Sequence, residues 1–132
     1  MWSIDRRTRH DDDVVRVDAP SFFDQQLPEL LDRNGSIAAT GLAALGAAPL
    51  GLDIEGYQRT IGLADDQLAV REGISDGALV VELDAEQFSD WVQQVHSFNA
   101  MWVARSIRPT GGTPGRWRDD LDVWDSVWLA LL

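Results

Sequence analysis

Two histidines and one carboxylate are the nearest that this sequence comes to a metal site. His10 and Asp12 have His-x-Asp spacing, and His96 is the second histidine of the chain. Two histidines and a carboxylate can hold a non-haem iron. Such ligands need rigid positions and supporting hydrogen bonds, whereas the first pair lies in a charged N-terminal stretch and His96 in a predicted helix. We therefore expect no metal ion and no cofactor.

Three pairs of carboxylates are candidates for acid–base chemistry: Asp65 with Asp66, Asp119 with Asp120, and Asp122 with Asp125. General acid catalysis at neutral pH requires an apolar pocket that raises the pKa of one carboxyl group. The sequence places no two of these acids in such a pocket. The first pair falls in a predicted turn and the second near a helix start, where acids are common. We therefore expect no catalytic residues and a protein that is not an enzyme.

Four of the eleven arginines lie within fourteen residues, around a Gly/Pro-rich loop at 106–116. They are Arg105, Arg108, Arg116 and Arg118. Guanidinium groups could bind a carboxylate or a phosphate there, although the glycines form no phosphate-loop motif and the chain has no lysine. The alternative is a solvated loop whose arginines offset the acids that follow it. The pattern leaves both interpretations open.

An aromatic stripe is the best candidate for a binding site. Its members recur at helical spacing: Phe88, Trp91, Val95, Phe98 and Trp102, joined by Trp124 and Trp128 in the last helical segment. Such rings supply much of the apolar area of a small domain. They could form a closed core, line a cavity for a hydrophobic ligand, or present a face to another domain. Spacing alone does not separate these alternatives.

Two helical segments are predicted before the first strand. Residues 20–34 have an apolar face, and we expect Pro28 to kink this helix or divide it in two, and Asn34-Gly35 to end it. Residues 36–49 are small and apolar, and predict a second helix that glycines weaken.

Four strands follow, because from Leu50 onward apolar residues alternate with period two. They cover 50–55, 57–64, 67–73 and 78–84. Short turns between successive strands predict an antiparallel meander. A short fifth strand is expected near 106–108.

Helices dominate the rest of the chain. Asp84 and Gln87 form a variant capping box before a helix at 85–97. Further helical segments cover 98–105 and 117–132. Segregated strands and helices predict an α+β fold, in which helices cover one face of an antiparallel or mixed sheet of four to five strands.

Length and charge limit the class of protein. The 132 residues fit one domain, with 1–18 as a charged arm. The sequence shows no signal peptide, no membrane span and no cysteine, so we expect a cytoplasmic protein without stable membrane insertion. A net charge of −11 argues against nucleic acid as a partner. The last helix runs to Leu132 without a stop signal, and we expect a further domain in a longer protein.

The order of elements resembles the sterol carrier protein type 2 fold. The resemblance rests on ALVVELDAEQFSDWVQ, SFNAMWVARSIRPTGG and the terminal LDVWDSVWLALL, after the strands. SIDRRTRHDDDV, the FF...LPEL helix and GLAALG also resemble one group, the sterol-carrier-like domain that precedes a phytanoyl-CoA dioxygenase-like domain in actinobacterial proteins. The family implies an apolar tunnel between sheet and helices. The loop PTGGTPGRWRDD departs from its pattern, and the tryptophans are bulky enough to fill such a tunnel.

The resemblance implies a non-catalytic lipid-binding module. Its ligand would be a fatty acid, a fatty acyl-CoA or a sterol-like lipid, which it would present to a fused C-terminal oxygenase domain that carries the iron chemistry. The aromatic stripe would contact the ligand. The alternative is a structural or docking domain with a solid core and no small ligand, whose last helix would pack on a partner domain through Trp124 or Trp128.

Overall fold

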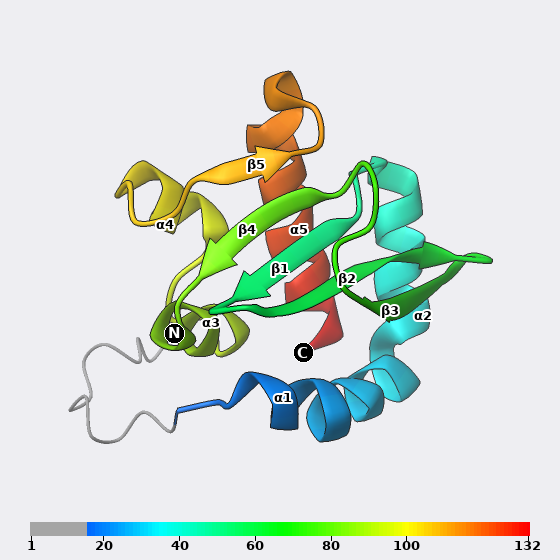
Figure 1. Cartoon of the computed structure of the whole chain (residues 1–132). Helices are drawn as coiled ribbons and strands as arrows, with labels where there is room; N and C mark the ends of the chain where they lie inside the picture. The colour runs from blue at the N-terminus through cyan, green and yellow to red at the C-terminus, as the bar shows by residue number, and fades with distance from the viewer. Residues whose placement is uncertain (1–15) are drawn as a thin grey trace, which may run out of the picture.

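The computed structural model describes residues 16–132, and a long helix opens this part of the chain (Figure 1). The helix consists of α1 (Ala19–Ser21), a π-helical turn η3 (Phe22–Gln26) and α2 (Leu27–Leu45). In the π-helical turn the Leu27 amide donates to the carbonyl of Phe22, five residues back. This wider turn directly precedes Pro28 and accommodates the residue that has no N–H to donate. Pro28 therefore does not divide the helix.

The predicted helix end at Asn34-Gly35 is wrong, because α2 continues to Leu45. Asn34 points instead toward α5 (Trp117–Leu131), where its Nδ2 donates to the carbonyl of Leu131 at 2.8 Å. Gly35 is buried. Packing of a helix face outweighs the helix penalty of one glycine, about 1 kcal/mol. The stop comes at Gly46, whose left-handed backbone (φ 72°) caps the last turn.

The sheet has five strands in the order β3-β2-β1-β4-β5. The strands are β1 (Leu50–Ile54), β2 (Tyr57–Ala64), β3 (Gln67–Glu72), β4 (Leu79–Leu83) and β5 (Pro109–Gly111). The first four strands confirm the predicted positions, and the fifth lies just after the predicted one. The mixed sheet with helices packed on it confirms the α+β class.

The antiparallel meander is confirmed for β1, β2 and β3 but wrong for β4. β4 pairs with β1 in parallel and with β5 antiparallel. Residues 73–78 therefore have to cross from the β3 edge to the far side of β1, over one face of the sheet (Figure 1). A parallel pair requires such a crossover connection.

Thr60 and Gly51 hold this crossover against the sheet. The buried Thr60 hydroxyl donates to the carbonyl of Gly73 at 2.7 Å and accepts from the Ser75 amide at 3.0 Å. A Cβ added at Gly51 would lie 3.1 Å from Cδ1 of Ile74, which would have to move. Both residues look unremarkable in a strand pattern, although the crossover depends on them.

The two faces of the sheet differ in polarity. Leu50, Leu52 and Ile54 alternate toward α2 and α5, as do Leu79, Val81 and Leu83. Figure 1 shows these two helices on the same side of the sheet. On the other face Asp53 and Glu82 are neighbours in the parallel register. The hydrophobic core therefore lies between the sheet and the helices.

The C-terminal half positions the aromatic stripe. Asp84 and Gln87 form the predicted capping box at the start of α3 (Ala85–Val92). That helix ends earlier than predicted, and residues 93–97 form a turn into α4 (Phe98–Val103). A 3-10 turn, η4 (Pro114–Arg116), leads from β5 into α5. No helix among residues 16–132 is long and apolar enough to cross a bilayer.

Candidate functional site

Five of the seven predicted stripe residues are fully buried in the core. Phe88, Trp91, Phe98, Trp124 and Trp128 are at most 2% exposed. Trp102 and Val95 lie at the margin and are partly exposed. The expectation that a partner domain buries Trp124 or Trp128 is wrong, because the domain itself already buries both.

The buried rings contact one another. Trp91 is stacked between Phe98, at a centroid distance of 4.2 Å, and Trp128, at 4.5 Å. The N-terminal helix completes the cluster, because Phe22 lies 5.6 Å from Trp128 and Phe23 lies 5.9 Å from Phe88. The space between the stacked rings is thus occupied by the rings themselves.

Each buried indole N–H also has a fixed partner. Trp124 Nε1 donates to the carbonyl of Ala48 at 2.7 Å, and Trp128 Nε1 to the carbonyl of Val92 at 3.2 Å. Trp91 Nε1 donates to Oδ1 of Asp125 at 3.1 Å. Buried polar groups need such partners, and these bonds fix the orientation of each ring.

Asp125 is the carboxylate most closely tied to this cluster. Besides Trp91, it accepts from the backbone amides of Phe98 at 2.9 Å and Asn99 at 3.3 Å. These are the first amides of α4, so Asp125 caps that helix from α5. Burial raises the pKa of Asp125, Asp122 adds to the rise, and the three hydrogen bonds act against it. The carboxylate therefore has a complete structural role.

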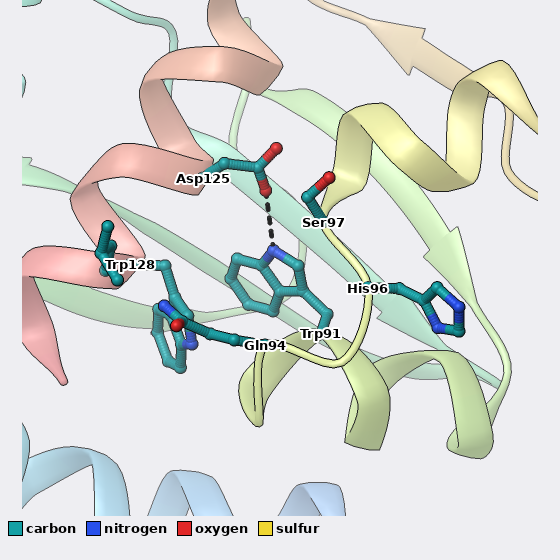
Figure 2. A pocket seen from close by; sticks show the side chains of 7 residues that line it. Trp91, Gln94, His96, Ser97, Asp125 and Trp128 are labelled. Atoms are coloured by element: carbon teal, nitrogen blue, oxygen red, sulfur yellow. Dashed lines mark hydrogen bonds between the residues drawn. The ribbon is translucent and has the colours of Figure 1, made fainter. Parts of the chain in front are cut away.

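A hollow of about 210 Å³ opens beside this carboxylate (Figure 2). Its lining consists of Trp91, Gln94, His96, Ser97, Asp125, Trp128 and Leu129. Figure 2 shows the His96 ring directed away from the Asp125 carboxylate. His96 Nδ1 lies instead 3.3 Å from Oδ2 of Asp90. His96 and Asp125 thus line the same hollow, but their side chains do not point toward a common position within it.

The other acids of the predicted pairs lie in a turn or interact with neighbouring side chains. Asp65 and Asp66 form the β2–β3 turn with positive φ angles of 52° and 65°. Asp120 is buried, and its Oδ1 lies 3.6 Å from Arg116 Nη2. Asp122 accepts a hydrogen bond from Asn99 Nδ2.

Metal ligation finds no support in the described part of the chain. Among residues 16–132, no group of three or more His, Asp or Glu side chains could hold a metal ion. His10 and Asp12, like most of the predicted 1–18 arm, lie outside the described residues. The third member of the hypothetical set, His96, pairs with Asp90.

The four predicted anion-binding arginines are exposed around α4, β5 and the start of α5. Arg116 forms the salt bridge to Asp120, so the charge-offset interpretation holds for this one arginine. Two partly exposed indoles lie among them, Trp102 and Trp117, with ring centroids 6.4 Å apart.

A second and larger hollow has no counterpart in the sequence prediction. It measures about 460 Å³ and is lined by Arg16, Val17, Asp18, Ala19, Pro20, Ile54, Glu55, Tyr57 and Ala85. The Tyr57 hydroxyl is buried without a hydrogen-bond partner among the described residues. Burial raises the pKa of Tyr57, and the Arg59 guanidinium, 4.1 Å from the ring centroid, acts against the rise. The one local sign was an aromatic residue at a strand start, which is common in any sheet.

Two comparisons by sequence found no match. No protein-family model matches the chain, and no curated protein matches it. The resemblance to the sterol carrier fold therefore stays a prediction, and the functional argument rests on geometry.

Proposed function

We propose that this domain is a structural or docking module that acts through its surface and has no internal ligand site. The observation that carries the proposal is the stacking of Trp91 between Phe98 and Trp128. These are residues that a tunnel would need as walls. Their faces meet each other, so a ligand would have to displace a ring before it could enter.

Displacing a ring would break several interactions at once. Moving Trp91 would cost both stacking contacts, each worth about 0.5–1.5 kcal/mol beyond area burial. It would also leave the Asp125 carboxylate short of one donor. Moving Trp128 would leave the carbonyl of Val92 without the indole N–H. A rigid, satisfied core of this kind suits a scaffold whose surface does the binding.

The test is a displacement titration with a fluorescent fatty acid and a fluorescent sterol. We expect no saturable binding and no change in tryptophan emission, because the buried indoles have no free face. A Phe98→Leu variant serves as the matched control, since it opens space beside Trp91 and should admit a probe if the core is the site. Saturable one-to-one binding to the wild-type protein, lost in a Trp91→Phe variant, would overturn the proposal.

A hydrophobic-ligand module is the second candidate, supported by the hollow beside Tyr57. Its volume lies within the range of small-molecule sites, about 300–1,000 Å³, and its lining is mostly apolar. The ligand in this version is a fatty acid, a fatty acyl-CoA or a sterol-like lipid, held by the apolar part of the lining. In this version the domain presents the lipid to a fused oxygenase domain.

Ala85 separates the two candidates. It lines the hollow from the start of α3, and its side chain is exposed. Ala85→Leu should fill the hollow and abolish any lipid binding there, while Ala104→Leu, at an exposed position after α4, should not. If lipid binding is seen and Ala85→Leu leaves it unchanged, the Tyr57 hollow is not the site.

A further inference from the structure

Four of the eleven arginines are concentrated at one end of this acidic molecule. Residues 98–118 hold four arginines and no acidic residue, and Asp119 and Asp120 follow directly. Three acids of α5 contact this stretch, and each has a partner there: Asp120 with Arg116, Asp122 with Asn99 and Asp125 with the first amides of α4. In Figure 1 this stretch forms α4, β5 and the start of α5, in yellow and orange, at one end of the fold. The four arginines are exposed and lie on neighbouring elements at one end of the fold.

Two indoles lie among these arginines. Trp102 and Trp117 meet edge to face with an interplanar angle of 72°, and both are partly exposed. Arg116 and Arg118 flank Trp117 in sequence, and the amide of Arg105 donates to the carbonyl of Trp102 at 2.9 Å. We call Trp102, Trp117 and the four arginines Arg105, Arg108, Arg116 and Arg118 the arginine–tryptophan surface.

The backbone beneath this surface is firmly held. Trp117 Nε1 donates to the carbonyl of Gly111 at 2.8 Å. Gly111 has a left-handed backbone (φ 67°), and a Cβ there would lie 2.6 Å from the carbonyl oxygen of Ala78, so only glycine fits. The loop is thus pressed onto β4 and presents the indole in a fixed position. Preorganised aromatic anchors of this kind lower the entropic cost of binding.

Most of the charge is unpaired. Arg105, Arg108 and Arg118 form no salt bridge with any residue from 16 to 132, and only Arg116 has an acidic partner, Asp120. Val103, next to Trp102, is 77% exposed. Unpaired guanidinium groups can bind carboxylates, and the apolar side chains beside them can contact an apolar residue next to those carboxylates.

We propose that the arginine–tryptophan surface docks an acidic segment of a partner protein that carries an apolar or aromatic residue. The proposal rests on the docking function above and names its surface and partner class. Trp and Arg dominate the binding energy of protein interfaces. A short acidic segment can contact the unpaired arginines alone, whereas nucleic acid or an anionic membrane also meets the field of a chain with net charge −11.

The test uses a fluorescein-labelled peptide of glutamates around one tryptophan, followed by fluorescence anisotropy with the full chain. We expect saturable binding that weakens as salt is raised, and no binding of the same peptide with glutamine in place of glutamate. Arg105→Gln/Arg118→Gln should weaken binding about tenfold or more. These positions leave the Arg116–Asp120 salt bridge intact.

The matched control is Arg33→Gln/Arg71→Gln, which removes the same charge from exposed positions on α2 and β3. Equal weakening by both variants would reduce the effect to net charge and overturn the proposal. Absence of binding to the glutamate peptide would also overturn it, as would equal or tighter binding of single-stranded DNA or anionic vesicles. Saturable lipid binding would overturn the proposed docking function itself. If neither lipid nor the glutamate peptide binds, only the assignment of the arginine–tryptophan surface is overturned.

Discussion

The five tryptophans among residues 16–132 fall into two groups that use the same side chain in opposite ways. Trp91, Trp124 and Trp128 are at most 2% exposed, and each indole N–H is bonded across the core. Trp102 and Trp117 are partly exposed, and they meet each other beside unpaired arginines. The first group holds the helices on the sheet. The second group is free to contact something else, and that difference separates a core from a candidate interface.

The largest expected effect comes from removing a core indole. Trp91→Ala should lower the free energy of unfolding by about 3–5 kcal/mol, as truncation of a buried aromatic residue commonly does. Trp102→Ala should cost only about 1 kcal/mol, because its ring is partly exposed. Urea denaturation of both variants measures the contrast. Similar losses for the two would erase the distinction between the groups.

The next largest effect is expected from Asp125, whose carboxylate bonds both to Trp91 in the core and to the start of α4. Asp125→Ala removes the acceptor of Trp91 Nε1 and of two α4 amides. We expect a loss of about 1–3 kcal/mol, the usual cost of leaving partly buried donors unsatisfied. Amide exchange should rise at Phe98 and Asn99 more than in α3. If protection is lost evenly across the domain, Asp125 does not act as the cap of α4.

The pH dependence of stability tests the same group. Because burial raises the pKa of Asp125 above its usual value, the folded state binds this proton more tightly than the unfolded state. The contribution of Asp125 is therefore most favourable below the unfolded pKa and declines as pH rises through the folded one. The stability of wild type relative to Asp125→Asn should increase as pH falls through this acidic window. A difference that stays constant or shrinks on acidification would contradict the assignment.

The sequence predicted correctly those helix starts and strands that depend on residues close together in the chain. The Asp84–Gln87 capping box and the alternation in β1 to β4 appear where the sequence places them. The partner of β4 could not be read in this way. Its pairing with β1 depends on the crossover that Thr60 holds, and no local pattern marks that contact.

The aromatic stripe was also predicted only as far as local sequence patterns reach. Periodicity identified the stripe of Phe88 to Trp128 as one face, but not what that face meets. The decisive partners are Phe22 and Phe23, far away in sequence on the N-terminal helix. The Tyr57 hollow is bounded by chain segments that no motif connects. Contacts between distant segments separate a core from a cavity, and a single sequence does not reveal them.

The smallest expected effect on stability belongs to the arginines. Arg105→Gln/Arg118→Gln should leave the free energy of unfolding within about 0.5 kcal/mol of wild type, since exposed substitutions outside special features rarely exceed that. Arg118 lies in the first turn of α5, where a positive charge opposes the helix dipole. Its removal should offset any small loss at Arg105. Thermal unfolding beside the peptide titration measures both properties on one sample. Residues that matter little for folding and strongly for peptide binding mark an interface, and a stability loss as large as that of Asp125→Ala would place these arginines with the core.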